Sequence, residues 1–271
     1  MTRLDVYLVT GGLVDSREKA KRLIESGAVT VNGKQAKKPA MTVTDTDTVL
    51  CDTTSLRFVG RGGYKLEKAL HAAVIDVTGC VALDVGASTG GFTDCLLQAG
   101  AKQVFSLDVG TDQLHPALRA DPRVVVLENT DIRDTAKTAV IPQSGVDICV
   151  IDVSFISLKQ VLPAVLPFLK ENARIVALIK PQFEAGRSAL GKHGVVKDPM
   201  IHRQVLTDLC TFFADEQLSV QHLDFSPIRG GEGNIEFLTV LVYTHTYTVD
   251  FTPPDIRAVV ESAQKTLKKG G

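Results

Sequence analysis

Apolar segments typical of strands alternate with helical segments over residues 81–243, and this alternation restricts the fold more than any other feature. It predicts an α/β fold in which a mainly parallel sheet carries helices on both faces. No helical segment separates the last two strands, so we expect them to pair antiparallel at one edge. The expected strands are Val81–Val85, Val104–Leu107, Val124–Leu127, Ile148–Ile151, Ile175–Ile179, Val220–Phe225 and Phe237–Tyr243. The expected helices are Phe92–Gln98, Leu158–Leu169 and Met200–Glu216.

A smaller unit with shorter elements precedes this pattern. Asp15 and Glu18 have the spacing of a helix-capping pair, and Gly27 is expected to end that helix. The Asn32-Gly33 dipeptide between two short apolar segments predicts a β-hairpin. The hairpin strands and one further strand are expected at Val29–Val31, Lys34–Ala36 and Asp47–Cys51.

The length of 271 residues suits two domains or one large α/β unit. We expect a small N-terminal α+β domain at residues 1–56 and a linker at residues 57–63. A larger α/β domain is expected at residues 64–250, followed by a C-terminal helix or tail at residues 251–271 whose end, from Lys265, is frayed.

The five cysteines are scattered, without a C-x-x-C pair and without histidine at ligand spacing. This pattern argues against a disulfide framework and against a structural zinc site, so we expect no metal. The N-terminus lacks the apolar core of a signal peptide, and no apolar run approaches the roughly 20 residues of a membrane-spanning helix. We therefore expect a soluble protein of the cytoplasm that has no membrane partner.

Positive charge is concentrated in residues 1–38, which carry eight basic and four acidic residues, although the formal net charge of the chain is −1. Arg17 and Lys21 are one helical turn apart and share a face, which would collect RNA phosphates with little base readout. On charge alone, a solvated helix face with Glu18–Arg22 pairing explains the pattern equally well. The candidate RNA-binding residues are Arg3, Arg17, Lys19, Lys21, Arg22, Lys34, Lys37 and, at the junction of the two domains, Arg61.

Residues 83–92, LDVGASTGGF, form a strand that ends in glycines and leads into a helix. Gly86 allows a tight turn, and Gly90 and Gly91 allow a ligand to approach the backbone. Asp108 ends the next strand, about 20 residues further on, where an acid can hold the ribose hydroxyls of an adenosine. Either Asn129 or Asp131 is expected to reach the adenine. The candidate cofactor-binding residues are Asp84, Gly86, Ser88, Thr89, Gly90, Gly91, Phe92, Asp108, Asn129 and Asp131.

The spacing of the glycines narrows the kind of nucleotide that this loop would bind. The pattern is D-x-G-x-x-x-G-G, which lacks the second glycine that admits a pyrophosphate in dinucleotide-binding loops. An adenosine without phosphates therefore fits better than NAD, although a purely structural turn remains an alternative.

Four charged residues lie where the expected strands end or begin. Asp152 and Lys180 each follow a strand, Glu236 directly precedes the last strand, and Lys65 lies where the two domains meet. In an open α/β sheet such strand ends form the reactive edge, so we expect the four side chains to converge beside the glycine loop. Three of them also have an ordinary alternative: a turn cap for Asp152, a solvated strand end for Lys180, and an ion pair with Arg229 for Glu236.

Two resemblances sharpen these expectations. The run SREKAKRLIESGAVTVNGK, within residues 3–50, resembles the small RNA-binding domain of the S-four type, named after a ribosomal protein. The chain from Arg3 to Tyr243 resembles the TlyA family, ribosomal RNA 2′-O-methyltransferases that are also called hemolysins, and its catalytic part is similar to FtsJ-type enzymes. The stretches that carry this resemblance are DVGASTGGFTD, IDVSFISL, LIKPQFEAG and GGEGNIEF.

The resemblance implies a Rossmann-like class I methyltransferase sheet, S-adenosylmethionine as cofactor, and methylation of cytidine ribose in ribosomal RNA of the large and, for some members, the small subunit. It places the family's catalytic tetrad on Lys65, Asp152, Lys180 and Glu236. Lys180 would accept the proton of the ribose hydroxyl, Lys65 would steer that hydroxyl, and the two carboxylates would orient the lysines.

Two positions depart from the family pattern. Gly60 occupies a place where serine is common, which we expect to loosen the domain hinge. His193 interrupts a usual glycine pair in a substrate loop and is expected to face solvent.

Three other functions remain open at this point. The hemolysin label suggests a membrane-damaging protein, but Met200–Glu216 has too little basic character for a membrane-surface helix. A ribosome-binding module without activity would not need the four charged residues of the tetrad. An NAD-dependent oxidoreductase is disfavoured by the glycine spacing.

Overall fold

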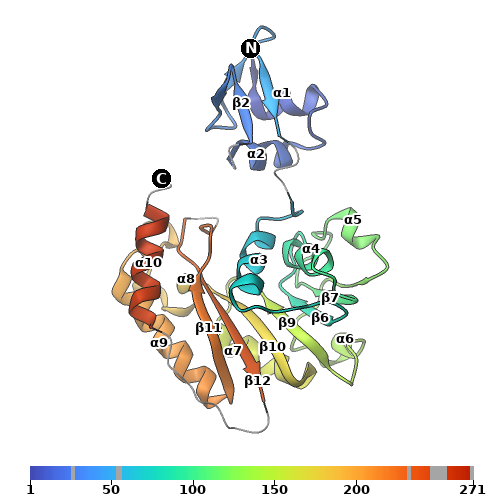
Figure 1. Cartoon of the computed structure of the whole chain (residues 1–271), viewed down its shortest axis with the longest axis vertical. Helices are drawn as coiled ribbons and strands as arrows, with labels where there is room; N and C mark the ends of the chain where they lie inside the picture. Colours follow the sequence, from blue (N-terminus) through green and yellow to red (C-terminus); the bar gives the residue numbers. More distant parts are fainter. Residues whose placement is uncertain (26–27, 53–56, 231–232, 245–254, 269–271) are drawn as a thin grey trace. The chain divides into compact units, whose positions relative to one another are not determined.

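The computed structural model describes residues 1–25, 28–52, 57–230, 233–244 and 255–268. The chain divides into two units, Met1–Arg57 and Phe58–Gly271 (Figure 1). Gly27, which we expected to end a helix, lies outside the described residues.

The N-terminal unit packs two helices against short strands around a small apolar core that includes Leu4, Leu8 and Leu23. The expected hairpin is confirmed: β2 pairs antiparallel with β3, and Asn32 and Gly33 both have the positive φ that a tight hairpin turn needs. The strand pairs are β1–β4 and, in a second sheet, the order β3–β2–β5. The elements are β1 (Thr2–Arg3), α1 (Leu4–Thr10), α2 (Arg17–Glu25), β2 (Val29–Val31), β3 (Lys34–Gln35), β4 (Thr42–Val43) and β5 (Val49–Cys51).

The cap of α2 differs from the expectation. Ser16 Oγ accepts the backbone N–H of Lys19 at 3.2 Å, whereas the Asp15 carboxylate pairs with the Lys19 side chain at 3.1 Å. The reason is position: α2 begins at Arg17, so Asp15 lies one residue too early to be the N-cap.

The second unit is built on one seven-stranded sheet in the order β11–β12–β10–β9–β6–β7–β8. The neighbours from β10 to β8 are all parallel, and β12 is antiparallel to both β10 and β11. The expected antiparallel pair at one edge is therefore confirmed, with β12 inserted next to β10. The strands are β6 (Val81–Val85), β7 (Gln103–Leu107), β8 (Val124–Leu127), β9 (Val146–Ile151), β10 (Leu169–Ile179), β11 (Leu218–Phe225) and β12 (Phe237–Tyr243).

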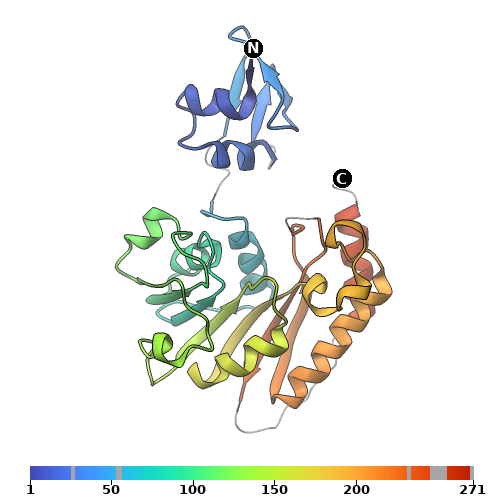
Figure 2. The same ribbon diagram turned by 180° about the vertical axis from the view of Figure 1, so that it is seen from behind.

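Helices cover both faces of this sheet, as Figure 1 and, from behind, Figure 2 show. Successive strand residues point to opposite faces, so Val150 packs with α3 and α4 while Ile151 packs with α7 and α9. The helices are α3 (Gly62–Ala72), α4 (Gly91–Gln98), α5 (Pro116–Arg119), α6 (Thr135–Thr138), α7 (Leu158–Val165), α8 (Pro181–Glu184), α9 (Pro199–Asp215) and α10 (Ile256–Lys268). None of the helices in these described ranges is long and apolar enough to cross a membrane.

Two segments differ from the sequence-based boundaries. Residues 57–63, which we expected to be a linker, contribute Phe58 to the core at 2% exposure, with its ring centroid 5.2 Å from that of Tyr64. Helix α3 already begins at Gly62, because Gly63 leaves room for the Phe58 ring. The helix expected at Leu158–Leu169 ends at Val165, since Pro167 lacks the N–H that would continue it.

The C-terminal segment is helical further than we expected. Helix α10 continues to Lys268 and packs against α9, and Val260 and Ala263 are fully buried. An apolar stripe on one face of α10 thus holds the helix in place where we expected fraying from Lys265.

Candidate active site

Two adjoining pockets open at the carboxyl ends of the parallel strands. We call the smaller one, about 230 Å³, the lysine pocket; Lys65, Gly86, Asp152 and Lys180 are among its lining residues. We call the larger one, about 620 Å³, the wide pocket; Asp108, Val109, Gln113, Asp131, Ile132 and Val161 are among its lining residues. Gly86, Ser88, Asp152 and Ser154 line both, so the two pockets share a wall.

The structure brings the four predicted catalytic side chains together: Lys65, Asp152 and Lys180 line the lysine pocket, and Glu236 joins them through its contact with Lys65. Lys180 Nζ lies 2.6 Å from Asp152 Oδ1, and Lys65 Nζ lies 2.6 Å from Glu236 Oε2. A third ion pair joins Lys65 Nζ to Asp152 Oδ2 at 4.0 Å. The four charges therefore form one continuous chain from Glu236 to Lys180.

Four different elements supply these side chains. Asp152 follows β9 and Lys180 follows β10, so parallel pairing places them at the same edge. Glu236 directly precedes β12, and the antiparallel register of β12 with β10 returns it to that edge. Lys65 comes from the first turn of α3, the helix that we had not expected.

The ordinary alternatives for Lys180 and Glu236 do not fit the structure. The Lys180 side chain is 10% exposed, so it is not a solvated strand end. Glu236 is 3% exposed and contacts Lys65, whereas Arg229 donates to the backbone oxygens of Gly233 and Leu267. Burial of charges at this level requires close partners, which the chain of ion pairs provides.

Two neighbours of this cluster were not predicted. Ser154 Oγ accepts a hydrogen bond from Lys180 Nζ at 2.9 Å, which gives the lysine a second fixed partner. Phe155 is 91% exposed at the rim of the wide pocket, has a φ of 65°, and lies 5.0 Å from the Phe183 ring. Ser154 and Phe155 both belong to the segment that follows Asp152. Nothing in the sequence indicates that Phe155 is exposed and has a strained backbone.

Gly86 makes the tight turn that was expected, whereas Gly90 and Gly91 have roles different from those expected. Gly86 has a φ of +86°, and a Cβ there would lie 2.8 Å from the Asp152 backbone oxygen. Gly90 faces the side chains of Leu114 and Leu118, and a Cβ on Gly91 would lie 3.0 Å from the Gly63 nitrogen. These two glycines therefore admit neighbouring protein atoms; Gly91 also lines the lysine pocket, together with Thr89 and Phe92, whereas Gly90 does not.

Asp84 is not among the described residues that line either pocket. Its side chain is fully buried beneath the loop, where Oδ2 accepts the Thr93 hydroxyl at 2.7 Å and Thr93 in turn contacts the Ser106 hydroxyl at 2.7 Å. Burial raises the pKa of Asp84 to about 7. We predicted that Asp84 binds the cofactor directly. Its burial contradicts this prediction, and Asp84 instead supports the glycine loop from the core side.

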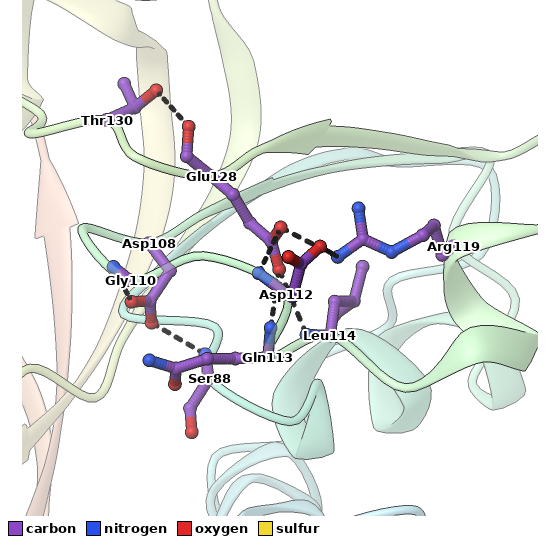
Figure 3. Close-up of polar contacts among 9 residues, drawn as sticks. All are labelled: Ser88, Asp108, Gly110, Asp112, Gln113, Leu114, Arg119, Glu128 and Thr130. Carbon is purple, nitrogen blue, oxygen red and sulfur yellow. Dashed lines mark hydrogen bonds and ion pairs between the residues drawn. The ribbon is translucent and has the colours of Figure 1, made fainter.

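Asp108 connects the glycine loop to the next strand end (Figure 3). Its two carboxylate oxygens accept the backbone N–H groups of Ser88 and Gly110, each at 2.7 Å. Asp108 and Ser88 also line the wide pocket, in keeping with their predicted place.

Of the two residues proposed to reach adenine, only Asp131 is among the described residues that line the wide pocket. Asp131 lines the wide pocket and pairs with Arg133 at 2.6 Å. Asn129 is exposed, is absent from the described lining of both pockets, and uses its backbone N–H to bind the Gly110 oxygen at 2.8 Å. Its φ of 49° turns the chain at this point, a conformation that asparagine tolerates in loops.

The two departures from the family pattern are also resolved. Gly60 is buried against the glycine loop, and a Cβ there would lie 2.8 Å from Thr89 Oγ1. It therefore serves close packing inside the second unit, in place of the looser hinge that we expected. His193 is exposed and has a φ of 66°, as expected for a solvent-facing loop residue.

The predicted RNA-binding residues lie in the N-terminal unit, apart from Arg61, which lines the lysine pocket. Arg3 and Arg17 are exposed, and each guanidinium lies 3.0 Å from the buried carboxylate of Asp5. Lys34 and Lys37 are exposed on and beside the hairpin. The remaining candidates, Lys19, Lys21 and Arg22, are half-buried along α2.

Comparison with known proteins gives the family. Residues 58–243 match the FtsJ-like methyltransferase family, and residues 2–49 match the S4 domain. A 16S/23S rRNA (cytidine-2′-O)-methyltransferase, TlyA of Mycobacterium tuberculosis, is 44% identical over 236 residues, which are 87% of this chain and 87% of that protein. Hemolysin A of Brachyspira hyodysenteriae is 40% identical over 87% of this chain and 98% of that protein.

A solved structure from Streptococcus thermophilus, assigned to a hemolysin, is 44% identical with a TM-score of 0.78 and covers 99% of this chain and 97% of that one. The sheet, its pocketed edge and these matches define an FtsJ-like methyltransferase joined to an S4 domain. The chain belongs to the TlyA/hemolysin A family of rRNA 2′-O-methyltransferases.

Proposed function

We propose that this protein transfers a methyl group from S-adenosylmethionine to the 2′-hydroxyl of a cytidine in ribosomal RNA. The observation that carries the proposal is the shared wall of the two pockets: Gly86, Ser88, Asp152 and Ser154 line both the lysine pocket and the wide pocket. A nucleoside in the wide pocket would therefore lie beside Lys180. The relative from M. tuberculosis, which is a cytidine-2′-O-methyltransferase, supports the choice of substrate.

The wide pocket fits S-adenosylmethionine better than a dinucleotide. Asp108 and Asp131 contribute carboxylates for ribose and adenine polar groups, and Val109 and Ile132 contribute apolar walls. Among the described lining residues Arg133 is the single basic side chain, and it is already paired with Asp131. Such a lining offers little to neutralise phosphates, and when bound in this pocket S-adenosylmethionine supplies a methyl group already activated on a sulfonium.

The residues of the lysine pocket then have distinct roles. Lys180 Nζ takes the proton of the ribose hydroxyl, while Asp152 at 2.6 Å and Ser154 at 2.9 Å hold the lysine side chain in place. Lys65 directs the hydroxyl, and Glu236 fixes Lys65 at 2.6 Å. Because each amine has a carboxylate partner within the buried cluster, the geometry is set before the RNA binds.

The basic surface of the N-terminal unit supports structured RNA as the substrate. Lys34 and Lys37 are exposed, and the S4 match covers residues 2–49. Contacts from such residues to phosphates give affinity without base readout, so the choice of nucleotide would fall to the catalytic unit.

The test is methyl transfer by purified protein to ribosomal subunits from cells that lack this protein, with labelled S-adenosylmethionine. Lys180→Ala should lower the rate by at least about 100-fold, since a positioned base contributes on this scale. The matched control is Lys170→Ala, because Lys170 pairs with Asp147 at 2.7 Å on the same two strands, β10 and β9, at their opposite ends.

We expect Lys170→Ala to methylate at nearly the wild-type rate. Wild-type transfer in both variants would overturn the role of Lys180, and a label found on a base in place of ribose would overturn the reaction itself.

A further inference from the structure

Glu128, which directly follows β8, has a carboxylate that binds three backbone donors of a neighbouring loop and the Arg119 guanidinium at the end of α5 (Figure 3). Oε2 accepts the backbone N–H of Asp112 at 2.9 Å, and Oε1 accepts those of Gln113 at 2.9 Å and Leu114 at 3.1 Å. The Arg119 guanidinium completes the set at 2.7 Å from Oε2. The Glu128 side chain is 13% exposed, so the carboxylate is largely enclosed by these donors.

These bonds shape the segment of residues 108–114, which follows β7. Asp112 has a φ of 53°, an unfavourable backbone conformation that must be held by its surroundings. A Cβ on Gly110 would collide with Gln113 Nε2, so the Gln113 side chain lies close over the Gly110 backbone. Gln113 and Asp108 both line the wide pocket, and the shape of this segment is therefore the shape of one pocket wall.

The same segment also supports the glycine loop. Leu114 packs against Gly90, and the backbone N–H of His115 donates to the Thr89 oxygen at 3.2 Å. A substitution of Glu128 would thus alter the segment after β7 and the glycine loop after β6, in addition to the end of β8 itself. Glu128 itself is not among the described residues that line either pocket, so it acts on a bound molecule only through the segment that it holds.

We propose that Glu128 is a positioning residue for the cofactor: its carboxylate fixes residues 112–114, among which Gln113 lines the wide pocket, and thereby sets the affinity for S-adenosylmethionine. This inference rests on the proposed function, because it takes the wide pocket as the cofactor site. It differs from the sequence-based expectation, in which the polar residues after β8 reach the adenine directly.

The chemistry of the carboxylate makes the role testable by a nearly isosteric change. Glu128→Gln keeps one acceptor oxygen but turns an amide N–H₂ toward backbone N–H groups, which cannot accept from it. The three loop N–H groups then lose part of their partners, and the segment loses its fixed conformation.

The experiment measures binding of S-adenosylhomocysteine to the full chain by calorimetry, together with steady-state methyl transfer. For Glu128→Gln we expect the Kd to rise about tenfold or more, the loss expected for charge-assisted hydrogen bonds. The KM for S-adenosylmethionine should rise by a similar factor, while kcat at saturating cofactor and the KM for RNA should stay near the wild-type values.

The matched control is Asp121→Asn. Asp121 lies in the loop between α5 and β8 and binds the Arg123 guanidinium at 2.7 Å and its backbone N–H at 2.9 Å, so it has the same chemistry as Glu128. It is not among the described lining residues of either pocket. We expect Asp121→Asn to leave the Kd unchanged.

If Glu128→Gln does not fold, the Arg119→Gln variant tests the inference in its place. This change removes the guanidinium and leaves the three backbone hydrogen bonds of Glu128, so we expect a smaller rise in the Kd for S-adenosylhomocysteine. An unchanged Kd in a folded Glu128→Gln protein, or an equal rise with Asp121→Asn, would overturn the inference alone. Loss of kcat in parallel with affinity would also overturn it, because a merely structural defect has that signature. Wild-type protein that binds no S-adenosylhomocysteine would instead overturn the cofactor assignment on which the inference rests.

Discussion

At the scale of single residues, Lys65, Asp152, Lys180 and Glu236 form a cluster in which each charge is paired with another. Lys65 forms ion pairs with both Asp152 and Glu236, and Lys180 forms an ion pair with the other carboxylate oxygen of Asp152. Removing one partner leaves an opposite charge buried and unpaired, which costs about 3–5 kcal/mol in typical proteins. Substitutions in this pocket therefore need a stability measurement beside each activity measurement.

Asp84 should make the stability of the protein depend on pH. Its pKa is about 7 in the folded protein against an ordinary value of 3.8, so between these values the folded state binds the proton more tightly than the unfolded state. The free energy of unfolding should therefore fall as the pH rises from about 4 to about 7, and this contribution should be constant above that range. Asp84→Asn keeps an acceptor for Thr93 and removes the titration.

The check is urea unfolding of the wild type and Asp84→Asn over this pH range. Their difference in unfolding free energy should grow in favour of the variant as the pH rises, by a few kcal/mol in total. Parallel curves for the two proteins would show that the buried Asp84 carboxyl does not titrate in this range.

At the scale of elements, the strand ends determine which residues meet. The apolar strands were predictable because strands buried on both faces consist of nearly continuous apolar residues. The convergence of Asp152 and Lys180 follows from parallel pairing, and that of Glu236 from the antiparallel return of β12. Fold and tetrad could thus be predicted from the pattern of strands together with the family resemblance.

Features that depend on tertiary contacts could not be predicted. Helix α3 was missed because Gly62 and Gly63 indicate a linker, yet they are needed to admit Phe92 and Phe58. Glu128 was missed because its partners are backbone groups that only the folded loop presents. Asp84 was misplaced because the sequence does not say whether a residue at a strand end points up to the ligand or down into the core.

Substitution of Gly90 tests how tightly the glycine loop packs against α5. Gly90→Ala should destabilise the protein in two ways, by its φ of +93° and by a collision with the Leu118 side chain. Gly79→Ala is the control, because Gly79 has a φ of +74° but no atom within 4 Å of a new Cβ. Gly79→Ala should cost about 1 kcal/mol of backbone strain, and Gly90→Ala a further 1–3 kcal/mol of overpacking.

Chemical denaturation of both variants measures the difference. Equal losses of unfolding free energy would mean that the contact between Gly90 and Leu118 carries no cost, and the packing account of this glycine would be wrong.

At the scale of the whole molecule, the chain joins an S4 unit to a methyltransferase unit, and the two should contribute to different kinetic constants. Replacing both Lys34 and Lys37 with alanine should weaken RNA binding and raise the KM for RNA, with kcat unchanged. It should also make the plot of log affinity against log salt less steep by roughly 1 to 2 units, because two phosphate contacts are lost.

Filter binding of ribosomal subunits at several salt concentrations provides the slope. Lys102→Ala is a suitable control, since Lys102 is exposed just before β7, at the amino end of the parallel strands and away from the pockets. A lowered kcat with an unchanged salt slope would assign Lys34 and Lys37 to catalysis in place of RNA binding.

The most direct test of the central claim is mass spectrometry of ribose methylation in ribosomal RNA from cells with and without this protein. We predict that at least one 2′-O-methylcytidine is present only in cells that contain the protein, and that it stays absent when the Lys180→Ala variant is supplied in its place. Identical ribose methylation in all three RNA samples would contradict the account.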